Sequence, residues 1–202
     1  LFDFHFNKRA EVERHSYGDL HHEMVFKECR TLYVSPDQLN SPKITKNVSE
    51  FNADIAFIFG VDLIKGPLLE ILPENKINLH LGLSPWYKGA ATLFWPFYFL
   101  QPQYSGVTFH QISIGADAGA IVHQAVPELT AGDGIHTVGA KCVLQAADDV
   151  NIILNIWKQT GFVPQSLQKN SGKLWLERDF KASHLRVIYD LYNDRIVDEF
   201  LG

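Results

Sequence analysis

The sequence predicts an α/β fold, with a mostly parallel twisted sheet flanked by helices and a short C-terminal strand–helix appendage. Short β-rich runs alternate with helical patterns through most of the chain, and this order is typical of right-handed crossovers between parallel strands. The pattern changes after Gly161, where Pro164 opens a polar stretch that reaches Gly172. We therefore expect a main domain over residues 1–161 and an appendage over residues 162–202.

The expected strands are short runs rich in β-branched and aromatic residues, each bounded by Gly, Pro or Asp. They are Thr31–Ser35, Asp54–Phe59, Ile77–Leu81, Val107–Ser113 and Ile121–Val126. The stretches between and after them have helical patterns, the last one long and amphipathic. These expected helices are Pro42–Phe51, Leu63–Leu72, Ala91–Leu100 and Thr137–Thr160. In the appendage we expect a strand over Lys173–Glu177 and a helix that begins near Ser183.

Composition and charge exclude several classes of protein. With 202 residues, 46% of them hydrophobic, the chain is long enough to bury a core. A formal net charge of −5 and the lack of a Lys/Arg block argue against a broad nucleic-acid surface. No apolar run approaches the roughly 20 residues of a membrane span, and the N-terminal stretch mixes acidic and basic residues, unlike a signal peptide. We expect a cytoplasmic protein with no nucleic-acid or membrane partner.

Two polar side chains mark the end of one expected strand. The stretch KINLHLGLSPWYKG is an apolar alternating run that carries Asn78 and His80 two positions apart. In an extended strand both side chains point to the same face of the sheet, so they can meet one substrate. The run breaks at Gly82, Pro85 and Gly89, which places both residues near the strand end, where open α/β sheets bind their ligands.

A carboxylate follows in the segment HQISIGADAGAIVHQ, which contains Asp117. Taken singly, Asn-x-His is more often a hydrogen-bonded structural pair and Asp-x-Gly a turn. Together a carboxamide, an imidazole and a carboxylate form a minimal acyl-transfer site, and their joint spacing favours a catalytic role for Asn78, His80 and Asp117. His110, seven residues before Asp117, is either a hydrogen-bonding neighbour behind these residues or a satisfied near-core histidine, and we assign it to the former.

The other candidate ligand residues give no metal site. His21 and His22 are adjacent, so on any regular element they point apart, and we expect them at the surface. Cys29 and Cys142 match no metal-binding spacing, and reduced core or near-core thiols are favoured over a disulfide. No metal is expected.

Two segments carry a resemblance to a known family. INLHLGLSPWYKG resembles the signature N-x-H-x-S-L-L-P-x-[FY]-x-G of the folate-dependent formyltransferases, and GVTFHQISIGADAGAIV resembles their G-V-T-x-H…D-x-G-x-I segment. The resemblance covers roughly residues 54–160 and includes glycinamide ribonucleotide, methionyl-tRNA and sugar-nucleotide N-formyltransferases. One departure is Gly82, which stands where the family usually has Ser. The resemblance implies a Rossmann-like formyltransferase fold, with the catalytic domain in residues 1–161.

The resemblance also implies a co-substrate and roles for the site residues. The formyl donor would be 10-formyltetrahydrofolate, and Asn78 would donate a hydrogen bond to the developing oxyanion. His80 would either accept the amine proton or, if protonated, stabilise the oxyanion, while Asp117 would orient and charge-stabilise it.

Binding residues can be carried over in the same way. The folate would contact the backbone of Ser113, Ile114, Gly115 and Ala116, with Leu63 and Ile64 as an apolar wall, although helix packing explains that pair equally well. The acceptor would contact Trp86, Tyr87 and Lys88, for which the alternative is a solvated loop.

The comparison with the family also bears on the class of acceptor, since two features that the chain lacks disfavour two of the known acceptors. No Gly/Ser-rich phosphate loop occurs before residue 50, which disfavours glycinamide ribonucleotide, and only about 40 residues of mixed charge follow Gly161, which disfavours tRNA. The segment ADAGAIV, the Trp/Phe-rich stretch ATLFWPFYF and the short appendage resemble the sugar-nucleotide formyltransferases, so a nucleotide-linked amino sugar is the preferred acceptor. Two alternatives remain open: hydrolysis of the formyl donor, and a non-catalytic folate-binding remnant. The family's first β-α-β stretch is expected to be incomplete here, and an uncovered sheet edge would favour pairing with a second chain as a homodimer.

Overall fold

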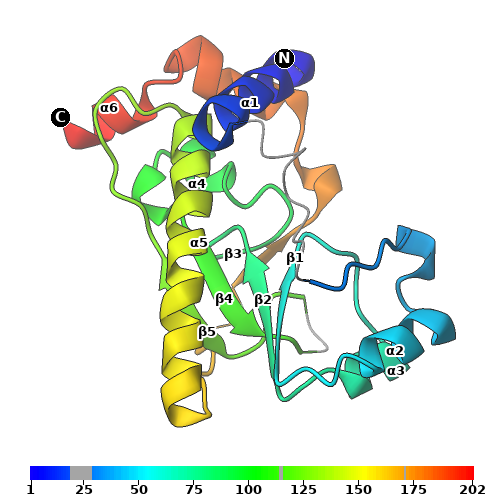
Figure 1. Ribbon diagram of the computed structural model, residues 1–202. Coiled ribbons are helices and arrows are strands. Elements are labelled where there is room, and N and C mark those ends of the chain that lie inside the picture. The colour runs from blue at the N-terminus through cyan, green and yellow to red at the C-terminus, as the bar shows by residue number, and fades with distance from the viewer. Residues whose placement is uncertain (19–28, 114–115, 171) are drawn as a thin grey trace.

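The centre of the structure is a four-stranded sheet in the order β1-β2-β4-β5 (Figure 1). The structure is a computed structural model that describes residues 1–18, 29–113, 116–170 and 172–202. The strands are runs of β-branched and aromatic residues, which suit a pleated and largely buried surface. Their bounds are Ile55–Phe59 for β1, Asn75–His80 for β2, Val107–Gln111 for β4 and Ile121–Ala125 for β5.

The α/β class is confirmed, but the expectation of a mostly parallel sheet is wrong. In the described part of this sheet β1 and β2 are parallel, whereas β2 pairs with β4 and β4 with β5 in antiparallel fashion. Parallel neighbours need a crossover of about a dozen residues or more, usually with a helix. The connection between β1 and β2 carries helix α3 (Pro67–Ile71). The connection between β4 and β5, residues 112–120, is too short for such a crossover.

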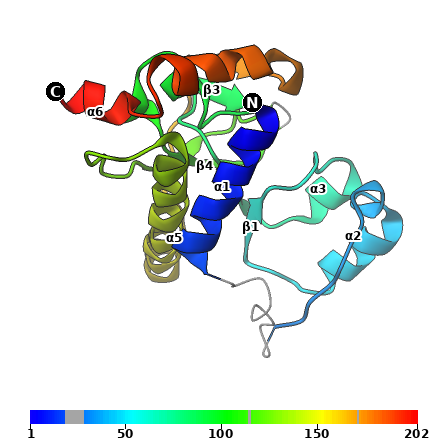
Figure 2. The ribbon, with the colours of Figure 1, turned by 90° about the horizontal axis from the view of Figure 1, so that it is seen from above.

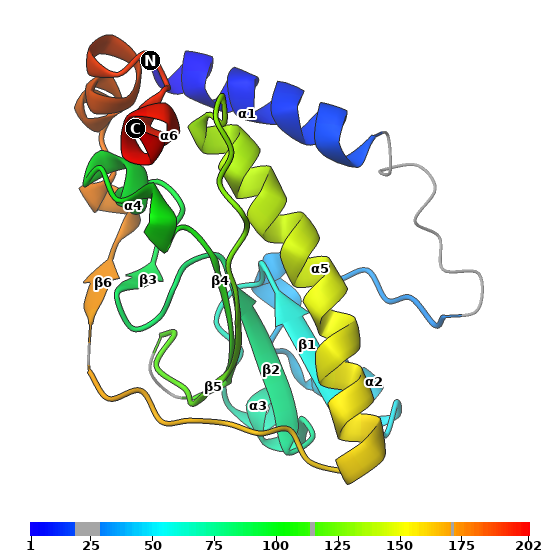
Figure 3. The same ribbon diagram turned by 90° about the vertical axis from the view of Figure 1, so that its left-hand side faces the viewer.

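A long helix packs against the sheet, and a second helix packs against the first. The long helix α5 (Ile135–Thr160) packs against β4 and β5 and ends at Gly161, which has the left-handed conformation common at helix C-termini. Helix α1 (Phe2–Tyr17) packs against α5, as Figures 2 and 3 show from two directions. Helices α2 (Pro42–Ser49) and α3 pack together beyond β1.

Several expected elements differ in extent, each for a local reason. The segment 31–35 is not a strand, and Tyr33 is 90% exposed. It does not pair with β1, which is left at the edge of the sheet. Helix α3 begins only after Gly66, whose φ is +57°, and not at Leu63. Helix α4 is limited to Trp95–Tyr98. Helix α1 was not among the elements predicted from sequence.

The remaining elements are short. Strand β3 (Tyr87–Gly89) and strand β6 (Lys173–Trp175) form a separate two-stranded parallel sheet. The 3₁₀ turns are η2 (Pro36–Gln38), η3 (Pro102–Tyr104), η4 (Glu177–Asp179) and η5 (Ala182–His184). Near the C-terminus lie η6 (Val187–Leu191), which has π-helical geometry, and helix α6 (Ile196–Leu201), so a single helix from Ser183 is not observed.

Residues 162–202 contact the main sheet and its helices along much of their length. An isolated antiparallel bridge joins Ser166 to Ile121. Trp175 stacks on Trp95 with ring centroids 4.0 Å apart and an interplanar angle of 18°. These contacts continue the core that includes Ile77 and Phe109, both fully buried. The division at residue 161 stays a prediction.

A buried pair of histidines joins α1 to α5 and to η6. The Tyr189 hydroxyl lies 2.7 Å from Nδ1 of His5 and 3.1 Å from Nε2 of His136, and the two imidazole centroids are 4.4 Å apart. Burial lowers the pKa of His5 to about 4 and that of His136 to about 3. Both rings are therefore neutral at pH 7.

The cysteines, the helices and the adjacent histidines can also be compared with the sequence predictions. Cys29 is exposed and Cys142 is buried, and each is a free thiol. Within the described ranges no helix combines the length and apolar character needed to cross a bilayer. His21 and His22 lie outside the residues that the structure describes.

The histidine pair predicts a loss of stability in acid. Both folded-state pKa values lie below the ordinary value of 6.5, so the unfolded chain binds more protons as the pH falls from 6.5 toward 4. We expect the free energy of unfolding in urea to fall by on the order of 2 kcal/mol between pH 7.5 and pH 5, after allowance for solvent screening. A His136→Phe variant should show a shallower pH dependence, and an unchanged slope in this variant would contradict the assignment.

Candidate functional site

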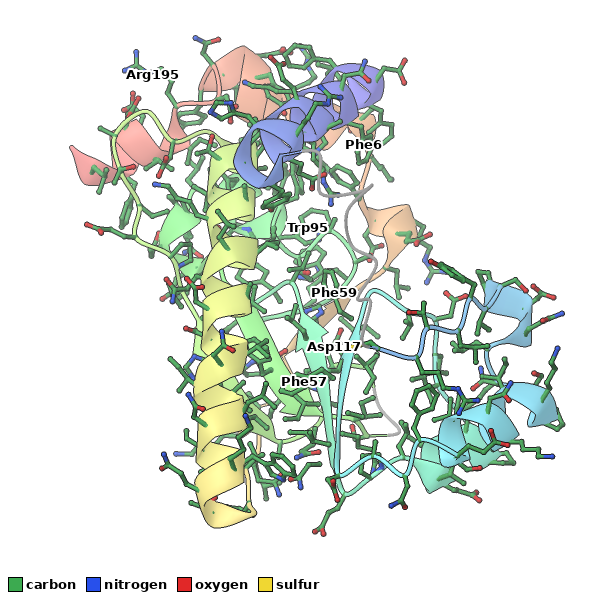
Figure 4. All side chains as sticks on the ribbon, in the orientation of Figure 1. Phe6, Phe57, Phe59, Trp95, Asp117 and Arg195 are labelled. Carbon is green, nitrogen blue, oxygen red and sulfur yellow. The ribbon has the colours of Figure 1, made fainter. Side chains whose placement is uncertain are left out.

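A cavity of about 690 Å³ lies between the ends of β1 and β2, helix α1 and the first half of α5. Asn78, His80 and Asp117 line it together with apolar side chains from β1 and α1, which include Phe59 and Phe6. Figure 4 labels Phe6, Phe59 and Asp117 around this region. The size falls within the usual range of small-molecule sites.

Strand β2 places two of the polar groups. Asn78 and His80 are two positions apart and therefore share one face of the strand, and β2 ends at His80. Across the antiparallel pairing Asn78 lies opposite His110 on β4. Cross-strand neighbours are close enough to interact, and the Nδ2 atom of Asn78 is 3.2 Å from Nε2 of His110.

The Asp117 carboxylate joins three elements. Its Oδ2 accepts a hydrogen bond of 2.8 Å from the Gly89 N–H and lies 3.4 Å from Nδ1 of His80. Its Oδ1 lies 3.3 Å from Nε2 of His110. Asp117 has a φ of +48°, a left-handed conformation that is uncommon for a residue other than glycine. One carboxylate thus contacts both imidazoles.

The hydrogen bonds to carbonyl groups fix the proton positions on both rings. Nε2 of His80 lies 2.9 Å from the Tyr87 carbonyl, so this nitrogen carries a proton and donates. In the neutral ring Nδ1 is then the basic atom, and it faces Asp117. His110 donates from Nδ1 to the Gln111 carbonyl at 2.9 Å. Its Nε2 lies 3.2 Å from Nδ2 of Asn78 and 3.3 Å from Oδ1 of Asp117.

Burial and the neighbouring charges oppose each other at His80. Burial lowers the pKa of His80 below its ordinary value, whereas the Asp117 charge and the Tyr87 carbonyl raise it and His110 lowers it, with burial dominant. Burial alone would raise the pKa of Asp117. The hydrogen bond from His110, the charge of His80 and the Gly89 N–H outweigh burial and lower the Asp117 pKa. The site therefore holds a carboxylate anion beside a neutral imidazole at pH 7.

Gly82 is explained by the packing around His80. A Cβ atom at this position would lie 2.7 Å from the Tyr87 carbonyl oxygen, 2.7 Å from the Cβ of Thr92 and 2.8 Å from Nε2 of His80. Real Cβ atoms do not approach neighbours this closely, so a serine side chain has no room here. The departure from the family signature is thus a feature of how this chain seats His80.

Several residues predicted for binding do not line this cavity. The apolar wall is formed by Phe59 and Val61, and neither Leu63 nor Ile64 takes part. Leu63 is 65% exposed, and its carbonyl accepts a hydrogen bond from Asn40. The end of β1 and the residues directly after it form this wall, since helix α3 begins only at Pro67.

The residues predicted to contact the acceptor are also displaced from the cavity. Trp86 is 52% exposed and contacts Tyr104. Tyr87 and Lys88 are buried in β3, and only the Tyr87 carbonyl reaches the site, where it contacts His80. Short strand β3 turns these side chains away.

The predicted folate-binding segment is only partly described. Ser113 and Ala116 are exposed at the two sides of the gap. Ile114 and Gly115 lie outside the described residues. Their predicted roles, like those of the catalytic residues, stay predictions.

Helices α1 and α5 supply lining residues that the sequence analysis missed. His5, Arg9 and Glu13 line the cavity from α1, and His136 lines it from α5. His5, Arg9 and Glu13 recur at every fourth position, a spacing that puts them on one face of a helix. That periodicity is the signal that identifies them. The described residues include no cluster of three His, Cys, Asp or Glu side chains suited to a metal ion.

Comparison with known proteins places these observations in a family. The family model described as "Formyl transferase" matches residues 8–150. The formyltransferase PseJ from Anoxybacillus kamchatkensis, solved in complex with UDP-4,6-dideoxy-4-formamido-L-AltNAc and tetrahydrofolate, is 26% identical, with a TM-score of 0.57 over 72% of this chain and 75% of that one.

Two structures of lower identity share the fold. A 4-N formyltransferase from Francisella tularensis is 17% identical, with a TM-score of 0.59 over 73% of this chain. A glycinamide ribonucleotide transformylase from Symbiobacterium toebii is 18% identical, with a TM-score of 0.54 over 63% of this chain and 62% of that one. The match spans 57% of the length of the Francisella protein.

The tight packing around Gly82 predicts the effect of introducing a side chain at this position. In Gly82→Ala the new methyl group should displace the His80 ring from the Tyr87 carbonyl and cost about 1–3 kcal/mol of stability by overpacking, measured by urea unfolding. Gly139→Ala is the matched control, because a Cβ there meets only Leu93 at an ordinary 3.8 Å. Equal stability of the two variants would show that the space around Gly82 is not restrictive.

Proposed function

The chain belongs to the formyl transferase family, as the resemblance implied, and we propose that it transfers a formyl group from 10-formyltetrahydrofolate to a primary amine. The observation that carries this proposal is the meeting of Asn78, His80 and Asp117 in one cavity, with the carboxylate 3.4 Å from the basic nitrogen of His80. Acyl transfer to an amine needs a donor for the developing oxyanion and a base for the amine proton. This arrangement offers both.

The cavity suits the formyl donor. The co-substrate supplies a carbon at the oxidation level of formate, attached to a folate that has a pterin ring and an apolar aminobenzoyl group. Phe6, Phe59 and Val61 line the cavity and are about half exposed, which leaves apolar surface for such a molecule. The polar groups Asn78 and His80 lie among them at the end of β2.

Asn78 is placed to stabilise the charge that develops on the formyl oxygen. The Nδ2 atom of Asn78 lies 3.2 Å from Nε2 of His110, and this contact fixes the orientation of the carboxamide. The second N–H is left to donate to the formyl oxygen as the amine nitrogen forms its bond to the formyl carbon. A preorganised donor of this kind typically lowers a barrier by about 3–4 kcal/mol.

His80 is placed to take the amine proton. Burial keeps the ring neutral at pH 7, and the hydrogen bond from Nε2 to the Tyr87 carbonyl leaves Nδ1 as the accepting atom. When Nδ1 receives the proton, the imidazolium lies beside the Asp117 carboxylate, whose charge stabilises it. The same proton is then available to the nitrogen that leaves the formyl carbon, so the ring returns to its neutral form. This favours the base over the alternative of a permanently protonated His80.

The acceptor that we propose is a nucleotide-linked amino sugar. The support is the structure of PseJ with a UDP-linked formamido sugar, at 26% identity. Arg9 lines the cavity and offers a guanidinium group to a phosphate, in exchange for its 2.7 Å ion pair with Glu13. Departure of Glu13 from this pair would leave Arg9 free to contact the diphosphate of the acceptor.

The decisive assay is turnover of 10-formyltetrahydrofolate, followed by absorbance, with nucleotide-linked amino sugars, with glycinamide ribonucleotide and with buffer alone. We expect transfer to a nucleotide-linked amino sugar, and a loss of on the order of 10²–10³ in kcat for Asn78→Ala. Turnover in buffer alone would indicate a hydrolase. Turnover with glycinamide ribonucleotide only would replace the proposed acceptor, and folate binding without turnover would indicate a binding protein.

The pH dependence tests the role of His80. Because the neutral ring accepts the proton, kcat should fall in acid with a midpoint below about 6.5. Asp117 raises the pKa of His80, so Asp117→Asn should move this midpoint to still lower pH while lowering kcat by on the order of 10²–10⁴. A midpoint that moves to higher pH in Asp117→Asn would contradict the proposed base.

A further inference from the structure

Gln168 contacts the loop that carries Asp117. It lies in the segment that leaves α5, runs beside the start of β5 and continues to β6 (Figure 3). Its Nε2 donates two hydrogen bonds of 2.8 Å each, one to the Asp117 carbonyl and one to the Gly119 carbonyl. None of the sequence motifs includes this residue.

The chemistry of the two acceptors fixes the orientation of the Gln168 amide. Both acceptors are carbonyl oxygens, so only the NH₂ side of the amide can face them, and a flipped amide would bring three oxygens together. Oε1 of Gln168 is buried and has no hydrogen-bond partner among the residues that the structure describes. A buried acceptor without a partner costs stability, yet this amide is held with its donor side toward the loop.

The loop needs such a restraint at this point. Asp117 has a φ of +48°, which side chains rarely adopt. Gly119 is packed so tightly that a Cβ would lie 1.7 Å from the Gln111 carbonyl oxygen. Gln168 holds the two carbonyls that flank Ala118, and so it fixes the main chain from which the Asp117 carboxylate projects toward His80.

A purely structural role for Gln168 is already filled by its neighbour. Ser166 forms two backbone hydrogen bonds with Ile121, of 2.7 and 2.8 Å, and these attach the segment to β5. The segment therefore stays in place without the Gln168 side chain. What Gln168 adds is a contact to the catalytic loop itself.

We propose that Gln168 is a positioning residue that holds the Asp117 carboxylate at its distance from His80 through the Asp117 and Gly119 carbonyls. The kinetic consequences rest on the proposed formyl transfer, whereas the geometric consequence does not. Without the two hydrogen bonds from Gln168, Asp117 should move away from His80. Misplacement of a catalytic group by about 1 Å can lower a rate by on the order of 100-fold.

The test compares Gln168→Met with Gln165→Met. Methionine has a similar length but donates no hydrogen bond, and Gln165 is an exposed residue of the same segment. The readout that needs no activity is the pKa of His80, from the titration of its ring proton by NMR, with His80→Asn to identify the signal. The titratable groups that face His80 are Asp117 and His110.

The expected result is a lower pKa of His80 in Gln168→Met, by about 0.5 unit or more, since a nearby carboxylate raises it. The value should be unchanged in Gln165→Met. In the assay, kcat should fall about 10- to 100-fold with KM for the acceptor within about threefold. An unchanged His80 pKa, with kcat lowered only in proportion to the loss of folded protein, would overturn the proposal.

A double-mutant cycle separates action through Asp117 from other effects. If Gln168 acts through this carboxylate, Gln168→Met should have no further effect on kcat in an Asp117→Asn background. Additive losses would overturn the proposal. If the wild-type chain transfers no formyl group to any acceptor, the proposed function fails, and the NMR titration still decides whether Gln168 positions Asp117.

Discussion

The arrangement of the site depends on how one buried carboxylate is shared. Asp117 contacts His80 at the end of β2, His110 on β4 and the Gly89 N–H on β3, so its position ties together the central sheet and the small sheet. A buried carboxylate stays ionised only when it is compensated by charges or hydrogen-bond donors. Each contact thus helps to keep the buried Asp117 carboxyl ionised.

The buried histidines show how the surroundings of an imidazole ring change its pKa. His5 and His136 share a tyrosine hydroxyl and have no carboxylate within the pair, and burial lowers the pKa of His5 to about 4 and that of His136 to about 3. His80 is equally buried but has Asp117 beside it, which opposes the effect of burial. One pair is suited to packing α1 against α5. His80 and His110 instead share a carboxylate, that of Asp117.

How much the sequence could predict depended on whether the information was local. The alternation that puts Asn78 and His80 on one face belongs to a single strand, so it was predictable. The strand-like segment 31–35 needed a neighbouring strand, which propensity cannot supply. The connection between β4 and β5 is too short for a parallel crossover, but the connection between β2 and β4 is long and contains α4, so its length did not reveal that these strands are antiparallel. Gln168 and the α1 residues lie far along the chain from the motifs, and only the fold brings them to the site.

The contacts of α1 have a consequence for the order in which the molecule forms. Helix α1 is made before its partners, because α5 and Tyr189 follow it in the sequence and His5 is 184 residues away from Tyr189. Most of the stability of a helix in a protein comes from tertiary packing, so α1 gains its lasting stability only after α5 and Tyr189 have been made. Contacts of such wide sequence separation slow folding. The side of the cavity that α1 forms is therefore completed late in folding. Asn78 and His80 are present in the nascent chain before the cavity around them is enclosed.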